Sequence, residues 1–152
     1  SDIKKMTIWG NHSPTMYPDL DNAEIKGESA SGWINDQNWI ESDFLRIVQQ
    51  RGKAIIDARG ASSATSAANA AIDTVKATLS ETPADDWFSA AVLSDGSYSV
   101  PEGLIFGFPL KADANGKVSI VQDLPISDYA QEKIDLTTQE LLDEKNDIEE
   151  LL

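Results

Sequence analysis

The segment DWFSAAVLSDGSYSVPEGLIFGFPLKADANGKVSIVQDLPI, residues 86–126, decides the fold of this chain. It contains two dipeptides that are typical of hairpin turns, Asp95-Gly96 and Asn115-Gly116. Apolar runs lie on both sides of the second dipeptide. Strands that are joined by short turns pair antiparallel, so we expect an antiparallel sheet over this segment.

Two consecutive helices are expected before the sheet. Residues 41–60, ESDFLRIVQQRGKAIIDARG, carry apolar side chains at helical spacing. We expect Ser42 to cap the start of this helix and Gly60 to close its end. Gly52 lies inside it at a cost of about 1 kcal/mol relative to alanine, and indicates either a tolerated glycine or close approach by another helix. The alanine-rich residues 62–79 follow directly and predict a second, tightly packing helix.

The remaining elements complete an α+β order. Met6–Gly10 is expected to form a short buried strand that leads into a loop. Ser62 or Ser63 can cap the alanine-rich helix, and Ser127 is expected to cap a long final helix whose many acids are most simply a solvated face. The order of strand, two helices, antiparallel strands and helix predicts the α+β class, with an antiparallel sheet packed with long helices.

Composition limits what the chain can do. Its 152 residues are expected to form a single domain, residues 1–152. The excess of 26 acidic over 12 basic residues argues against nucleic acid as a partner. Without cysteine and with one histidine, no metal site is expected. No apolar run is long enough to span a membrane, so we expect a soluble, cytoplasmic protein.

The single histidine, His12, lies in TIWGNHSPTMYPD, residues 7–19, directly after the predicted strand. An imidazole on such a loop can exchange a proton near neutral pH, although a lone histidine is more often structural. The small-residue turn at residues 60–64 opens a helix, and could either hold an anion or simply cap the helix. No glycine-rich phosphate-binding fingerprint is present. The residues alone therefore suggest one half of an acid–base system and no cofactor site.

Three ordered blocks carry a resemblance to a known family. They are TIWGNHSPTMYPD, QQRGKAIIDARGASSATSAANAAIDTV (residues 49–75) and SDGSYSVPEGLIFGFP (residues 94–109). Together they resemble the C-terminal half of malate dehydrogenase, in the bacterial branch related to the cytosolic type. The resemblance runs from about Ile3 onward through the chain, and implies the fold of the lactate/malate dehydrogenase C-terminal domain.

The resemblance implies roles for two residues. His12 of WGNHS would be the catalytic acid–base, which donates a proton to the C2 carbonyl oxygen of oxaloacetate and takes the proton of the malate hydroxyl in the other direction. Ser62, the first serine after ARG-x, would line the substrate pocket. NAD would be the cofactor and no metal would be needed. An N-terminal NAD-binding Rossmann domain, absent from this chain, would supply the carboxylate that orients the histidine and the arginines that bind the substrate.

The resemblance also implies the protein's partners and a place in the tricarboxylic acid cycle. We expect malate or oxaloacetate as substrate, the N-terminal domain of the same protein as a neighbour, and a homodimer. The chain alone is expected to be inactive. Two alternatives stay open: another 2-hydroxy-acid dehydrogenase of the lactate type, or a stand-alone domain without catalysis that dimerises or binds a partner. The choice between malate and lactate is made in the missing half, and the preference for NAD or NADP also stays open.

Overall fold

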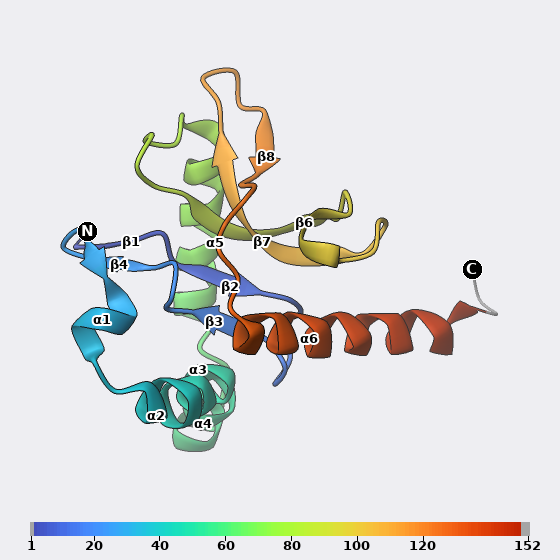
Figure 1. Cartoon of the computed structure of the whole chain (residues 1–152). Coiled ribbons are helices and arrows are strands. Elements are labelled where there is room, and N and C mark those ends of the chain that lie inside the picture. Colours follow the sequence, from blue (N-terminus) through green and yellow to red (C-terminus); the bar gives the residue numbers. More distant parts are fainter. Residues whose placement is uncertain (1, 150–152) are drawn as a thin grey trace.

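The antiparallel sheet predicted for residues 86–126 is confirmed by the computed structural model, which describes residues 2–149 (Figure 1). Its strands, in spatial order, are β6 (Phe88–Leu93), β7 (Ile105–Ala112) and β8 (Val118–Ile120). Phe88 lies opposite Leu110 at one end of the β6–β7 pair. β7 is the central strand and most of its side chains are buried.

The two turn signals of the sheet behave differently. Asn115-Gly116 lies in the short connection between β7 and β8, where Gly116 has a φ of +78° that glycine adopts without strain. The Asp113 carboxylate accepts two backbone N–H groups of this turn, at 2.8 and 2.9 Å. Asp95-Gly96 instead opens a longer connection between β6 and β7, so the tight turn expected there is not formed.

Residues 3–29 form two small antiparallel sheets. The strands are β1 (Ile3–Lys4), β2 (Thr7–Trp9), β3 (Tyr17–Asp19), β4 (Glu24–Ile25) and β5 (Glu28–Ser29). β2 pairs with β3, and β1, β4 and β5 form the other sheet. Gly10 forms a bridge with Gly107 that joins the end of β2 to β7. The short buried strand predicted at residues 6–10 is therefore confirmed as β2.

The helices differ from the prediction in two respects: the short helix at residues 30–34 was not predicted, and the helix expected over residues 41–60 begins earlier and is interrupted at Gln50. Their bounds are α1 (Ala30–Ile34), α2 (Gln37–Trp39), η1 (Ile40–Phe44), α3 (Leu45–Gln49), α4 (Arg51–Arg59), α5 (Ala64–Leu79), η2 (Ser97–Ser99) and α6 (Asp128–Asp147). The side chain of Asp36, rather than Ser42, caps the helical run, because it accepts the N–H of Trp39 at 3.0 Å. Ser42 already lies inside the helix and donates its hydroxyl to the carbonyl of Asn38.

The other predicted helix ends are confirmed in part. Gly60 ends α4 with a φ of +68° and donates its N–H to the Ile56 carbonyl at 2.8 Å. Ser127 caps α6 by accepting the N–H of Ala130 at 3.2 Å. Ser63 occupies the N-cap position of α5, but its side chain makes no capping hydrogen bond. A side chain at Gly52 would meet nothing within 4 Å, so no described helix approaches it.

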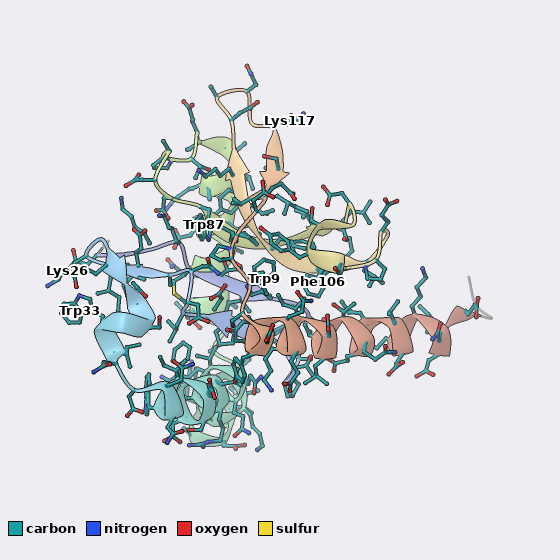
Figure 2. The ribbon with its side chains drawn as sticks, in the orientation of Figure 1. Trp9, Lys26, Trp33, Trp87, Phe106 and Lys117 are labelled. Carbon is teal, nitrogen blue, oxygen red and sulfur yellow. The ribbon has the colours of Figure 1, made fainter. Side chains whose placement is uncertain are left out.

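The main core lies between the β6–β8 sheet and the first half of α6. Figure 2 shows Trp9 and Phe106 in this space, where both are fully buried together with Phe108 and Ile134. The Trp9 indole donates to the buried Asp19 carboxylate at 3.1 Å. The second half of α6 extends away from the sheet, and its residues from Asp143 onward are exposed (Figure 1).

None of the helices within residues 2–149 combines the length and the apolar character that crossing a membrane requires.

Candidate functional site

His12 lies in the loop between β2 and β3, with its side chain at the surface. It lines a hollow of about 270 Å³ together with residues of β2, β6 and β7 and with Gly10, Asn11 and Met16 of its own loop. The residues from these strands are Ile8, Ser89, Ala90, Ala91 and Gly107. These side chains are small or apolar, so the imidazole is the group in this hollow that is chemically able to act as a general acid or base. The sequence-based prediction that a strand presents His12 at the edge of a pocket agrees with this placement.

Two glycines hold the base of the His12 loop against β7. The Gly10 N–H donates to the Gly107 carbonyl at 3.3 Å, and the Gly107 N–H donates to the Gly10 carbonyl at 2.9 Å. A Cβ at Gly107 would lie 2.6 Å from the Ile8 carbonyl oxygen. Gly10 has a φ of +97°, and a Cβ there would lie 2.3 Å from the Thr137 hydroxyl oxygen. Glycine is therefore required on both strands for this close approach.

The loop is also attached to α6. The Asn11 N–H donates to the Thr137 hydroxyl at 3.0 Å, and the His12 N–H donates to the Asn11 side-chain carbonyl at 2.8 Å. The Ser13 hydroxyl donates to the Glu140 carboxylate at 2.5 Å, and the Thr15 hydroxyl donates to the same oxygen. Glu140 thus departs from the solvated face that was expected for the acids of this helix.

Sequence reasoning missed Thr137 and Glu140 because neither belongs to a recognisable motif. Thr137 is a fully buried threonine in the middle of a helix, and Glu140 is one acid among several along α6. The spacing of three residues places Thr137 and Glu140 on one face of a predicted helix, which is the one weak signal that the sequence offers. Nothing local to that face identifies the loop at residues 10–16 as its partner.

Ser62 lies on the exposed connection between α4 and α5. It does not line the hollow that contains His12. The described residues therefore do not bring the two predicted site residues into one cavity. The role of Ser62 in a substrate pocket stays a prediction.

Within residues 2–149, no carboxylate forms a hydrogen bond or an ion pair with the His12 imidazole. No cluster of three or more potential metal ligands is found in the same range. The histidine can therefore exchange a proton, but a substrate would need additional groups to hold it and to orient the imidazole. Acid–base chemistry is the chemistry that this arrangement supports.

Solved structures of two kinds of dehydrogenase share this fold. Malate dehydrogenase from Naegleria fowleri is 42% identical, with a TM-score of 0.90 over 99% of this chain and 46% of that one. Trichomonas vaginalis lactate dehydrogenase in complex with NADH and oxamate is 30% identical, with a TM-score of 0.86 over 95% of this chain and 45% of that one. Plasmodium falciparum malate dehydrogenase in complex with NADH, at 21% identity and a TM-score of 0.81, shares the fold.

The chain spans less than half the length of each of these relatives. Residues 1–152 match the family described as lactate/malate dehydrogenase, alpha/beta C-terminal domain. The α+β architecture with its antiparallel sheet agrees with that description. Since the match covers the whole chain, this protein belongs to the lactate/malate dehydrogenase family, as a C-terminal domain of that family.

Proposed function

We propose that this chain is the C-terminal catalytic half of an NAD-dependent malate dehydrogenase, in which His12 is the proton donor and acceptor. The observation that carries the proposal is the position of His12, fixed on a loop at the edge of a small hollow, in a chain of this family. Malate is favoured as substrate because the malate dehydrogenase of Naegleria fowleri is 42% identical, whereas the Trichomonas lactate dehydrogenase is 30% identical.

His12 carries the proton chemistry in this proposal. Its imidazolium donates a proton to the oxygen at C2 of oxaloacetate, and its neutral imidazole accepts the hydroxyl proton of malate in the reverse direction. The hydride at C2 would come from NADH, and would return to NAD in the reverse direction. The neighbouring Ser89, Ala90 and Ala91 leave room beside the ring for a small substrate. We propose that Ser62 contributes to the same substrate site in the presence of the N-terminal domain.

The described residues do not fit the dinucleotide itself. The chain contains no glycine-rich turn that would bind a pyrophosphate, and the hollow beside His12, at about 270 Å³, falls below the usual size of ligand pockets. We therefore assign NAD binding to an N-terminal Rossmann domain outside residues 1–152. It follows that the 152-residue chain alone has no dehydrogenase activity.

The exposed face of α5 supports a partner. Ile72, Val75 and Leu79 of α5 are 55%, 56% and 77% exposed, and lie at helical spacing along one side of the helix. Contiguous exposed apolar surface is typical of an interface. We propose that a second copy of the protein covers this face and that the active protein is a homodimer. The cytoplasm is the proposed location, on the resemblance to the cytosolic-type enzymes.

The first experiment is to read the gene upstream of Ser1 and to express this chain joined to whatever domain precedes it. The joined protein is expected to contain a strand, a glycine-rich turn and a helix, and to oxidise NADH with oxaloacetate. His12→Asn in the joined protein should lower kcat by about 100-fold to 10,000-fold. Its dissociation constant for NADH, followed by nucleotide fluorescence, should not change.

Three results would contradict parts of this proposal. An unchanged kcat in His12→Asn would remove the histidine from the chemistry. Faster turnover of pyruvate than of oxaloacetate would make the protein a lactate-type enzyme, like the Trichomonas relative. The absence of an upstream domain would indicate a stand-alone module, and the search would turn to a protein partner.

A further inference from the structure

α6 contacts the His12 loop on both sides of the histidine. On one side, the Thr137 hydroxyl accepts the Asn11 N–H at 3.0 Å. On the other side, the Glu140 carboxylate accepts the Ser13 hydroxyl at 2.5 Å. Thr137 and Glu140 are three residues apart, so they project from the same face of α6. The histidine lies between two attachment points on a single rigid element.

The attachment reaches the histidine backbone through Asn11. Its main-chain N–H is held by Thr137, and its side-chain carbonyl accepts the His12 N–H at 2.8 Å. Thr137 is fully buried, and its side chain packs where a Cβ of Gly10 would lie. The main chain of residues 10 and 11 therefore has little space in which to move.

Glu140 holds the other side of the loop by charge-assisted hydrogen bonds. Its carboxylate accepts the hydroxyls of both Ser13 and Thr15, and the Ser13 hydroxyl in turn accepts the Thr15 N–H at 3.1 Å. Hydrogen bonds to a charged acceptor are about twice as strong as those between neutral groups. This cluster fixes the turn that directly follows the histidine.

We propose that Thr137 and Glu140 are positioning residues for His12, which hold the imidazole where it can reach a substrate. The proposal rests on the catalytic role of His12 proposed above. Catalytic loops owe their precision to the elements that support them, and a displacement of about 1 Å can cost about 100-fold in rate. In this protein the supporting element is the C-terminal helix of the described residues.

The first test is NMR on the 152-residue chain. Because His12 is the only histidine, its Cε1–H resonance is unambiguous. Thr137→Val keeps the shape of the side chain but removes the acceptor of the Asn11 N–H. Hydrogen exchange of the Asn11 amide should become about tenfold faster, as expected for the loss of one hydrogen bond. The His12 resonance should shift or broaden, and Thr137→Ser should restore both signals.

Thr138→Val is the matched control for this substitution. Thr138 is the adjacent buried threonine, and its hydroxyl donates to the Ile134 carbonyl of its own helix at 2.7 Å. The Thr138→Val variant should leave the hydrogen-exchange rate of the Asn11 amide and the His12 resonance unchanged. If Thr137→Val and Thr138→Val behave alike, the proposed attachment through Thr137 is wrong.

Glu140→Ala tests the second attachment without changing the buried threonine. It should broaden the His12 resonance and speed exchange of the Thr15 amide, while Glu144→Ala, which removes an exposed acid one turn further along α6, should do neither. A Glu140→Ala spectrum identical to that of Glu144→Ala would overturn the role of Glu140.

Kinetic measurements on the joined protein distinguish a failure of the positioning role of Thr137 from a failure of the proposed dehydrogenase function. Thr137→Val should lower kcat by about 10-fold to 100-fold, with a Tm equal to that of Thr138→Val and with recovery in Thr137→Ser. An active enzyme in which Thr137→Val keeps the wild-type kcat would overturn the positioning role. If the wild-type joined protein has no activity, the proposed function fails, and the NMR comparison still decides whether α6 holds the loop.

Discussion

Gly10 is the residue at which the strand, the His12 loop and α6 meet. Its φ of +97° is a conformation that residues with a Cβ rarely adopt. Its Cα faces the Thr137 side chain, so that a Cβ would lie 2.3 Å from both Oγ1 and Cγ2. The positive φ and the contact with Thr137 are therefore two independent reasons why glycine is required at this position.

Gly10→Ala is expected to lower the free energy of unfolding by about 2–4 kcal/mol, since backbone strain and overpacking add. Urea denaturation followed by tryptophan fluorescence measures the change. Gly27→Ala is the matched control, because Gly27 has a similar φ of +85° but nothing within 4 Å of the Cβ position. Strain alone should cost the control about 1–2 kcal/mol. Equal losses in the two variants would show that the contact with Thr137 does not contribute.

Ser62 offers a second test at the residue scale, in the joined protein. If its hydroxyl binds the substrate, Ser62→Ala should raise KM for oxaloacetate by about 2-fold to 10-fold, the worth of one hydrogen bond, with little change in kcat. Ser63→Ala is the control, because the Ser63 side chain makes no capping hydrogen bond. Steady-state kinetics that leave KM unchanged in Ser62→Ala would remove this residue from the site.

At the scale of the elements, the turn between β7 and β8 is stabilised by the carboxylate of Asp113, so that its stability depends on pH. Hydrogen bonds from the Lys117 and Asn115 backbone N–H groups hold the pKa of Asp113 below its ordinary value of 3.8. A carboxyl group whose pKa is lowered by folding stabilises the folded state above its ordinary pKa. That contribution disappears as the pH falls through the lowered pKa.

Asp113→Asn should therefore change how Tm depends on pH. The amide can still accept the backbone N–H groups but does not titrate. Near pH 5 we expect the wild-type protein to have the higher Tm, and this difference should shrink as the pH is lowered towards about 2. Thermal unfolding followed by circular dichroism measures both proteins across this interval. A difference in Tm that stays constant with pH would contradict the role of the charge.

Elements defined by local signals were predictable from the sequence. The turn at Asn115-Gly116, the end of α4 at Gly60 and the cap of α6 at Ser127 each depend on residues within a few positions of one another. The start of α2 was missed because Ser42 and Asp36 are both acceptable caps, and only packing selects between them. Inside the helix, Ser42 bonds to a carbonyl four residues earlier instead.

The residues of α6 that hold the His12 loop could not be predicted from local sequence patterns, and the reason is physical. Asn11 and Thr137 are 126 residues apart, and the hydrogen bond between them depends on how α6 packs across the core. The sequence drew attention to His12 because it is the only histidine and follows an apolar strand, whereas its acid–base role was implied by the resemblance to malate dehydrogenase and stays a prediction. It could not indicate Glu140, whose side chain differs from those of the other acids of α6 only in what lies next to it.

At the scale of the whole molecule, the exposed apolar face of α5 should govern association. We expect the 152-residue chain to form dimers or larger species whose fraction grows with concentration, because burying such a face removes apolar area from water. Val75→Lys should shift the population towards monomer in sedimentation velocity runs. Leu93→Lys, at a comparably exposed residue of β6, is the control and should not. A chain that is monomeric at every concentration would contradict the proposed dimer interface.

The attachment of the His12 loop to α6 also fixes the order of events during biosynthesis. Glu140, which accepts the hydroxyls of both Ser13 and Thr15, lies 127 positions after Ser13 and 125 positions after Thr15. At about 5–20 residues per second, a ribosome adds Glu140 roughly 6–25 s after Ser13. Throughout that interval the nascent protein lacks the hydrogen bonds from Glu140 that hold the turn after the histidine, although Gly107, which pairs with Gly10, is already made for part of it. A chain released before Thr137 would contain every residue of the loop and still lack the two residues of α6 that hold it.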